Sequence, residues 1–575
     1  IELAAARSKV LTPPALLARL DSRLKTLTGG GRDRTARQQT LRGAIDWSYS
    51  LLEAAEQVLL ARLGVFAGGG TFAAIEAVIN AGDPIDMDLL DGLASLMDKS
   101  LIRQLEDTDG EPRFVQFETI REYALERLEA RGEAARMRRQ HVEYYLGVVE
   151  EATPELTGPH QEKWLKQLDH EHGNLRAALD WTLRTPGAGP DVCELGVRLA
   201  GALWRFWEIR GHINEGRTWL TLALAVRCDP AVSRVLSARA RVLTGAGNLA
   251  WAQGAYAEAR ALHEQSLAQY QQLGDQHGSA TALGNLGLVA LSQGDRTTAR
   301  TFHVASLSLR RELGDQRGIA TTLNSLAGIA LDEGDDATAH SLYEESLALL
   351  RDVGDRRGVA YALGNLGLVA INEGDLDAAR GLYEESLGLR RELGDKRGIA
   401  SALNNLGVLA LEQGNIDAAR ACYEESLALR RELGDRAGIA VSLANLAAIA
   451  IDQNDYHSAR TLYGESLTLQ FQLQAPDGIA ACVAGLVRAA AGLHDDERAA
   501  RLAGALAAHV DVSGDYGLGA DDPGLDDAIA AVRARLGDQA WIAAWEGGKG
   551  MSLTETVAYA IPDLHGAGVA GIAAP

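Results

Sequence analysis

A side-chain amide recurs at intervals of forty residues through the middle of this 575-residue chain. The position is occupied by Asn285, Ser325, Asn365, Asn405 and Asn445. A carboxamide can donate and accept a hydrogen bond at once, so it matches the peptide group of an extended polypeptide. A row of such amides could therefore bind the backbone of a partner. The same amides could instead bond to neighbouring helices and set the spacing of the repeats, and the sequence leaves both interpretations open.

The residues around each amide indicate what else this surface would offer. Three residues further on the chain is mostly apolar, and seven residues further on it is polar or acidic, as at Asp332, Glu412 and Asp452. Lys and Arg are missing from these positions, so a clamp for a C-terminal carboxylate is not expected. We predict a groove for a protein or peptide with apolar anchors and neutral or basic flanks. Its residues would be Asn285, Asn365, Asn405, Asn445, Leu288, Leu368 and Val408.

An internal repeat supplies the elements that would position these residues. Comparison of residues 361–400 with residues 401–440 gives 26 identities in 40 positions. Segments that recur with this period include GNLGLVALSQGD, which begins at Gly284, and LYEESLGLRRELGD, which begins at Leu382. A fixed period of this length indicates helical units that stack on one another.

Each repeat is predicted to contain two helices. Asp355 and its equivalents stand where a side chain can cap the first helix, and Gly354 before it suits the left-handed turn that ends the preceding helix. In the second helix Ala299, His303 and Ser306 share one face, with tyrosine at the His303 position in later repeats. We expect this face to be buried.

These positions resemble the tetratricopeptide repeat, in which Leu, Gly, Ala, aromatic and small residues recur in a fixed order. The usual period is about 34, so the forty-residue version implies a longer second helix. The resemblance is clearest over residues 240–479, and residues 200–224 and 480–508 resemble degenerate copies. It implies a mainly all-α fold, an α-solenoid whose first helices line a concave face.

The first 150 residues have a different character. We predict helices at residues 37–52, 55–69, 89–102 and 118–131, and a hairpin of strands at residues 101–105 and 113–117. This order is typical of a winged-helix domain. The helix that would enter DNA carries Asp88, Asp91 and Asp98 against Lys99 alone, so we expect no direct nucleic-acid binding.

Several segments together resemble bacterial signal-transduction ATPases with numerous domains, of the STAND and NB-ARC type. They are LTGG, RQQTLRGAIDWSYSLL, LGVFAGG, LLDGLASLMDKSL, ETIREYALERL and HGNLRAALDW. In that family the opening residues IELAAAR follow a nucleotide-binding domain. The resemblance implies an ATPase before this region, a switch controlled by ATP and ADP, a winged helix that acts as a relay, and repeats that sense a signal.

No phosphate-binding GxxxxGK(S/T) motif occurs in these residues. We therefore expect ATP or ADP only in the intact protein, and no enzyme activity, catalytic residue, metal or cofactor in this region. The formal net charge of −22 disfavours nucleic acids and anionic membranes as partners. The four cysteines lack CxxC spacing, and no apolar run of about 18 residues is present, so we expect a cytoplasmic location.

These expectations combine into one organisation. The predicted segments are the end of the nucleotide-domain helical region at 1–36, a winged helix at 37–135, a helical linker at 136–195, the repeat array at 196–510, and a C-terminal helical cap and tail at 511–575. The predicted function is the partner-binding part of an ATP-controlled signal-transduction or transcriptional regulator. The alternative is a free-standing tetratricopeptide scaffold or adaptor with no ATPase partner domain.

Overall fold

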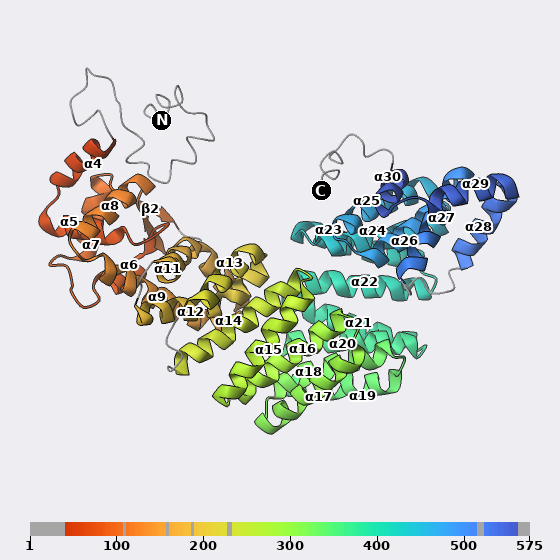
Figure 1. The fold of residues 1–575 in the computed structure, drawn as a ribbon, viewed down its shortest axis with the longest axis horizontal. Coiled ribbons are helices and arrows are strands. Elements are labelled where there is room, and N and C mark those ends of the chain that lie inside the picture. Colours follow the sequence, from red (N-terminus) through yellow and green to blue (C-terminus); the bar gives the residue numbers. More distant parts are fainter. Residues whose placement is uncertain are drawn as a thin grey trace, which may run out of the picture. The chain divides into compact units, whose positions relative to one another are not determined.

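The computed structural model describes residues 41–106, 111–156, 160–185, 189–226, 233–513 and 523–561. These residues are almost entirely helical, with one small sheet, which confirms the predicted fold class (Figure 1). The chain divides into two compact units, residues 1–309 and 310–575. The segment predicted at 1–36 lies outside the described residues, as does the predicted tail beyond residue 561.

The described residues of the predicted winged-helix region form five helices and three strands. They are α4 (Leu41–Ser50), α5 (Ala54–Leu63), β1 (Gly70–Thr71), α6 (Phe72–Ile79), α7 (Leu89–Asp98), β2 (Arg103–Glu106), β3 (Pro112–Val115) and α8 (Glu118–Ala130). The expected hairpin is present, since β2 pairs antiparallel with β3 and places Gln104 opposite Phe114. Strand β1 pairs with the other edge of β3, which gives the sheet order β1-β3-β2.

The sequence-based assignment of this region was wrong in two places. The helix expected at 55–69 ends at Leu63, and the chain then turns into β1 through Gly68 and Gly69, both at positive φ. Helix α6 was not predicted at all. The Thr71 side chain caps it by accepting a hydrogen bond from the Ala74 backbone N–H, and its apolar residues are buried at helical spacing. Both signals were present in the sequence.

Five helices follow before the regular repeats begin. They are α9 (Ala134–Glu155), α10 (Gln161–His170), α11 (His172–Arg184), α12 (Pro190–Arg210) and α13 (Ile213–Ala225). Helix α9 packs against α6, α11 and α12. Trp207 and Phe206 of α12 are fully buried in the same core as the winged-helix region. Helices α12 and α13 form the helix–Gly–helix pair predicted for residues 200–224, joined at Gly211.

The repeats are regular pairs of antiparallel helices. The first unit contains α14 (Ser233–Ala252), α15 (Tyr256–Leu273), α16 (Gln276–Ser292) and most of α17 (Arg296–Leu313). The second unit contains α18 (Gln316–Asp332), α19 (Asp336–Asp352), α20 (Arg356–Asn372), α21 (Leu376–Glu392), α22 (Lys396–Glu412), α23 (Ile416–Leu433), α24 (Arg436–Asp452), α25 (Tyr456–Gln472), α26 (Pro476–Gly492) and α27 (Asp496–Ser513).

Helix boundaries in the array form as predicted. The Asp355 carboxylate accepts a hydrogen bond from the Gly358 backbone N–H at 2.9 Å, which caps α20. Gly354 before it has φ of +68°, a conformation that glycine adopts without steric cost. The buried face of the second helices is also confirmed, since Ala299, His303 and Ser306 are all buried.

Two contacts repeat from one helix pair to the next. The ring of Tyr383 on α21 lies directly beneath Gly367 on α20, where an added Cβ would be 2.5 Å from the ring. The Ser386 hydroxyl donates to the carbonyl oxygen of Ala360 at 2.7 Å, and equivalent serines do so throughout the array. The small and hydroxyl residues of the repeat are therefore packing residues.

The charged residues of the second helices pair between repeats. Arg351 bonds to Glu385 at 2.9 Å and Arg391 bonds to Glu425 at 3.1 Å, each pair 34 residues apart. The partners lie on neighbouring second helices because these helices pack side by side. All four side chains are about half exposed, so each pair contributes at most about 1 kcal/mol.

Three short helices cap the array: α28 (Pro523–Leu536), α29 (Asp538–Lys549) and α30 (Leu553–Ala560). Helix α29 packs closely on α27, since an added Cβ at Gly504 would meet the Trp545 carbonyl at 2.1 Å. Helix α28 packs on α26 and α27, with Val532 fully buried.

Candidate functional site

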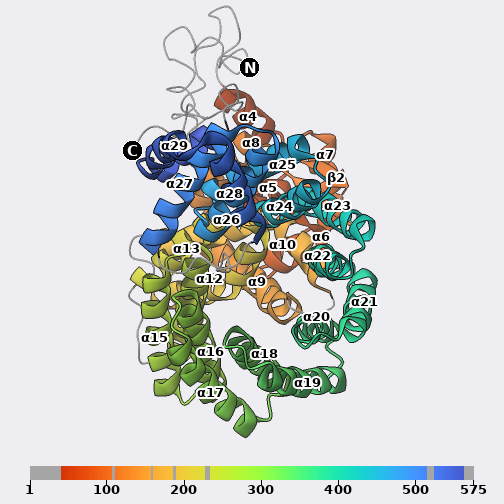
Figure 2. The same ribbon diagram turned by 90° about the vertical axis from the view of Figure 1, so that its right-hand side faces the viewer.

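The first helices of the second unit form one continuous surface. Figure 2 shows α18, α20 and α22 on the inner side of an arc, with α19, α21 and α23 on its outer side. We call the solvent-facing side of α18, α20, α22 and α24 the inner face. It contains Asn365, Asn405, Asn445, Leu368 and Val408 of the predicted groove.

Large apolar side chains remain exposed on this inner face. Leu368 is 43% exposed and Val408 is 37% exposed, while Leu366 and Leu409 beside them are buried. Tyr361, on α20, is 55% exposed. Exposed apolar residues at equivalent positions of successive helices are a feature of binding surfaces, although single ones are common.

The amides of the inner face are not equivalent. The Asn445 amide donates a hydrogen bond to the Asn404 side-chain oxygen on the preceding first helix, at 3.0 Å. This contact fits the interpretation that the amide sets the repeat spacing. Asn365 and Asn405 make no side-chain hydrogen bond within the described residues, so their amides are open to a ligand.

The edge of the inner face is acidic, as the sequence indicates. Asp332 and Glu412 are exposed. Helix α18 begins at Gln316, so Arg317 lies in its first turn. Its guanidinium is paired with the Asp355 carboxylate at 2.8 Å, which favours a structural role over a carboxylate clamp.

The remaining predicted groove residues, Asn285 and Leu288, lie on α16 in the first unit. Leu288 is exposed to the same degree as Leu368. The Asn285 amide nitrogen is buried and has no hydrogen-bond partner among the described residues. A buried donor without a partner is costly, so this amide could gain from a ligand oxygen.

A buried polar network joins the sheet of the first unit to helix α11. The Arg113 guanidinium on β3 donates to both Glu171 carboxylate oxygens at 2.7 and 2.9 Å, and also to the carbonyls of Gly68 and Gly69. The Asn174 amide donates to the Gly69 carbonyl at 2.9 Å. Sequence analysis missed this network, although two of the segments quoted above, LGVFAGG and HGNLRAALDW, contain part of it.

The same network extends into helix α9. The Tyr145 hydroxyl accepts from the Asn174 amide at 2.9 Å, and His141 bonds to the Asn174 side-chain oxygen at 3.2 Å. Burial lowers the pKa of His141 to about 4, so its imidazole is neutral at physiological pH. The arrangement couples three elements, and its chemistry is structural.

Helix α7, which occupies the recognition position, presents acidic residues to solvent. Asp91 and Asp98 are exposed, and the Lys99 ammonium that follows is bound to the buried Glu56 carboxylate at 2.5 Å. Lys99, the only cationic residue at this end of the helix, is therefore paired with an acidic residue of its own domain.

Two family matches cover these regions. Residues 238–312, 279–352, 318–392, 358–432 and 398–470 match the tetratricopeptide repeat, and residues 52–129 match a winged helix-turn-helix domain. The chain carries both modules. We refer to them below as the repeat array and the winged-helix domain.

Curated relatives cover part of the chain. A candidate HTH-type transcriptional regulator of Mycobacterium tuberculosis is 37% identical over 243 residues, which is 42% of this chain and 27% of that protein. An uncharacterised protein of the same organism is 38% identical over 135 residues, 23% of this chain and 34% of that protein. The chain thus spans about a quarter to a third of the length of these relatives.

Solved structures with helical repeats are similar at a low level. A signal-transduction ATPase with numerous domains and a tetratricopeptide repeat sensor, from Pyrococcus horikoshii, is 15% identical, with a TM-score of 0.40 over 82% of this chain and 72% of that one. A Rap protein complexed with competence and sporulation factor is 13% identical, with a TM-score of 0.41 over 59% of this chain and 95% of that one. Superpositions this loose say nothing about what the present chain binds.

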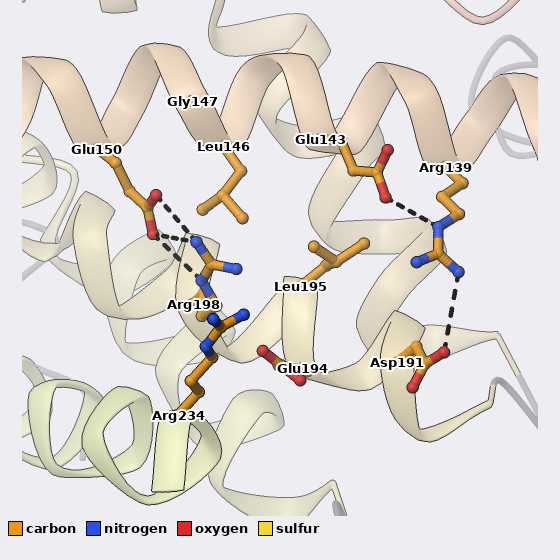
Figure 3. Close-up of a pocket in the computed structure, with 10 residues that line it drawn as sticks. All are labelled: Arg139, Glu143, Leu146, Gly147, Glu150, Asp191, Glu194, Leu195, Arg198 and Arg234. Carbon is orange, nitrogen blue, oxygen red and sulfur yellow. Dashed lines mark hydrogen bonds and ion pairs between the residues drawn. The ribbon is translucent and has the colours of Figure 1, made fainter. Parts of the chain in front are cut away.

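A polar cavity of about 410 Å³ lies in the first unit between α9, α12 and α14 (Figure 3). Its charged groups are largely paired with one another. Arg198 bonds to both oxygens of Glu150 at 2.9 and 3.0 Å, and Arg139 bonds to Glu143 at 2.8 Å. Because these pairs neutralise each other, the cavity has no strong preference for an ion of either sign.

Other chemistry finds little support in the described residues. No group of three or more His, Cys, Asp or Glu side chains there could hold a metal ion. Gly547 to Gly550 end helix α29, and an added Cβ at Gly548 would meet the Arg501 carbonyl at 1.9 Å, so this segment packs on a helix and cannot cradle a phosphate. None of the described helices combines the length and apolar character needed to cross a bilayer.

Proposed function

We propose that this region is the partner-binding part of an ATP-controlled signal-transduction or transcriptional regulator, in which the repeat array holds a protein or peptide. The observation that carries the proposal is the exposure of Leu368 and Val408 beside open amides on the inner face. Apolar side chains supply binding energy when a partner covers them, and amides can pair with its backbone. The acidic edge favours a partner with neutral or basic flanks.

The winged-helix domain is proposed as a relay and not as a reader of DNA. The acidic surface of α7 argues against DNA reading, since proteins that read the major groove approach phosphates with cations. The buried network of Arg113, Glu171 and Asn174 supports the relay role, because it ties the sheet of the winged-helix domain to helix α11.

ATP control is proposed from the resemblance to signal-transduction ATPases alone. These residues contain no GxxxxGK(S/T) motif, so the proposal places the nucleotide elsewhere in the intact protein. The coding sequence upstream of Ile1 tests this directly. A phosphate-loop motif followed by Gly-Leu-Pro would support the switch, and a start codon close to Ile1 would favour the scaffold alternative.

Partner binding can be tested with peptides of random sequence. A phage-displayed library of random linear peptides is selected on the full chain, and the affinity of each selected peptide is measured by fluorescence anisotropy. We expect the double variant Leu368→Ala/Val408→Ala to bind at least about tenfold more weakly, as for loss of two apolar anchors. The control is Leu433→Ala/Leu473→Ala, which removes two comparably exposed leucines at the C-terminal ends of second helices.

Failure to select any peptide, or equal affinity for the two double variants, would remove the inner face as the binding site. The relay is tested on the same complex by hydrogen exchange. A bound peptide should change the protection of residues 111–116 and 171–179, which form the network. Changes confined to the helices that contact the peptide would contradict the relay.

A further inference from the structure

Helix α18 differs from the two first helices that follow it, α20 and α22, at two adjacent positions. Helices α20 and α22 have the order Gly367-Leu368 and Gly407-Val408, whereas α18 has Ala327-Gly328. In α20 and α22 a tyrosine ring lies beneath the glycine, and an added Cβ at Gly367 or Gly407 would be 2.5 Å from that ring. The residue after the glycine, Leu368 or Val408, has a large side chain that is exposed on the inner face.

In α18 the equivalent space contains Ala327, which is fully buried. The partner tyrosine, Tyr343 of α19, instead brings its hydroxyl close to Gly328. A Cβ added at Gly328 would have only this hydroxyl oxygen within 4 Å, at 3.7 Å. The inner face therefore has a notch at Gly328 in place of a leucine or valine, and the Tyr343 hydroxyl forms its floor.

Several polar groups around this notch lack partners. The Tyr343 hydroxyl makes no hydrogen bond within the described residues, and the Asn324 side-chain oxygen is buried without one. In α22 the equivalent Asn404 oxygen is satisfied by Asn445. Asn324, Gly328 and Asp332 are spaced by four residues, so they lie along one stripe of α18. The Asp332 carboxylate is exposed and forms no ion pair in this part of the chain.

The neighbouring helix α20 contributes an aromatic ring. Tyr361 is 55% exposed. Burial, with smaller effects from nearby Tyr361 and Asp332, raises the pKa of Tyr343 to about 12, so its phenol is neutral at physiological pH and can still accept a hydrogen bond. The notch is thus lined by two groups that only accept hydrogen bonds, a carboxylate and an amide oxygen, and by a phenol hydroxyl that can accept as well as donate, next to an exposed ring.

We propose that Asp332, Tyr343, Tyr361 and Asn324 form a subsite that accepts a lysine or arginine side chain of the partner. A cationic side chain offers only donors, so it can bond to the Asp332 carboxylate, the Asn324 oxygen and the lone pairs of the Tyr343 hydroxyl. The carboxylate supplies a charge-assisted hydrogen bond, and an exposed tyrosine ring can hold a cation over its face. The proposal rests on the proposed function, because the cation would belong to the segment held by the inner face.

The test uses the peptides selected on the full chain. We expect most to carry Lys or Arg at one position, and norleucine at that position should weaken binding by about tenfold. Asp332→Asn and Tyr343→Phe should each weaken binding of the basic peptide, and should have little further effect on the norleucine peptide. The matched controls are Glu412→Gln, an exposed acid at the equivalent position of α22, and Tyr383→Phe, the equivalent tyrosine beneath Gly367.

A third variant closes the notch by restoring the residue order of the neighbouring repeats, Ala327→Gly/Gly328→Leu. It should fold normally, bind the norleucine peptide as tightly as the parent does, and lose its preference for the basic peptide. Thermal melting of every variant separates loss of binding from loss of folding.

The outcomes distinguish the two proposals. If no peptide binds, or if binding ignores Leu368 and Val408, the proposed function fails. If peptides bind through those residues but show no basic preference, or if Asp332→Asn and Tyr343→Phe match their controls, the subsite is wrong while the inner face stands. A preference for a neutral hydroxyl side chain would likewise overturn the assignment to a cation.

Discussion

The guanidinium of Arg113 and the carboxylate of Glu171 form a two-point ion pair at 2.7 and 2.9 Å, and both side chains are buried. The partners come from strand β3 and the start of helix α11. An ion pair away from water is costly to break, because removal of one partner leaves an uncompensated charge. The pair therefore ties the winged-helix domain to the helices that follow it.

Replacement of one partner should loosen this junction strongly. We expect Glu171→Gln to lower the local free energy of opening by about 3–5 kcal/mol, the usual cost of leaving one buried charge. Hydrogen exchange of residues 111–116 and 171–179 measures it without assuming a single unfolding step. The double variant Arg113→Met/Glu171→Met removes both charges and should be less damaging than Glu171→Gln. If the double variant lowered the local free energy of opening more than Glu171→Gln does, this account would be contradicted.

The hydrogen bond that links the two helices of one repeat should make a smaller, measurable contribution to the free energy of unfolding. The Ser346 hydroxyl donates to the Ala320 carbonyl at 3.0 Å, and both residues are buried. We expect Ser346→Ala to destabilise the second unit by about 1 kcal/mol, measured by urea denaturation. Ser401→Ala is the control, since its exposed hydroxyl bonds only within its own helix. Equal effects of the two variants would mean that this contact between the two helices contributes nothing.

The sequence predicted what depends on local pattern and period. The caps such as Asp355, the buried aromatic positions such as Tyr383, and the hairpin of β2 and β3 all depend on neighbours within one repeat or one turn. Helix α6 was missed although its cap and apolar spacing were visible, because the expected winged-helix order left no place for it.

Contacts between segments that are distant in the sequence could not be predicted from it. Arg113 and Glu171 are 58 residues apart, and the sequence around one gives no indication that it contacts the other. Arg351 and Glu385 are 34 residues apart, and only the packing of neighbouring second helices brings them together. At the candidate site the amide row was visible, but the bond from Asn445 to Asn404 depends on the register of two helices. The groove residues remain a prediction.

Acid should destabilise the array through buried histidine. Burial lowers the pKa of His263 to about 4, below the ordinary value of 6.5 that it regains on unfolding. Between these values the unfolded chain binds more protons, so stability falls as the pH drops from about 6.5 towards 4, by up to roughly 1.4 kcal/mol per pH unit. At neutral pH the effect is absent.

Repeats further along the chain carry tyrosine at this position, as at Tyr343 and Tyr383, so His263→Tyr should reduce the loss of stability between pH 7 and pH 5. Denaturation midpoints at the two pH values measure it, and His457→Gln, which replaces an exposed histidine, serves as the control. His141 has a similarly low pKa and would still contribute in the variant. An unchanged difference between the two pH values would exclude His263 as a source of acid sensitivity.

A matched pair of glycine variants tests the packing difference between α18 and α20. Gly367→Ala places a Cβ 2.5 Å from the Tyr383 ring, so we expect a loss of about 1–3 kcal/mol from overpacking. Gly328→Ala meets only the Tyr343 hydroxyl at 3.7 Å, and the gain in helix propensity should stabilise the unit by about 0.5–1 kcal/mol. Urea denaturation of both variants gives the sign of each change. If Gly328→Ala also destabilised, the space above that glycine would not be open, and the notch on which the cation subsite depends would not exist.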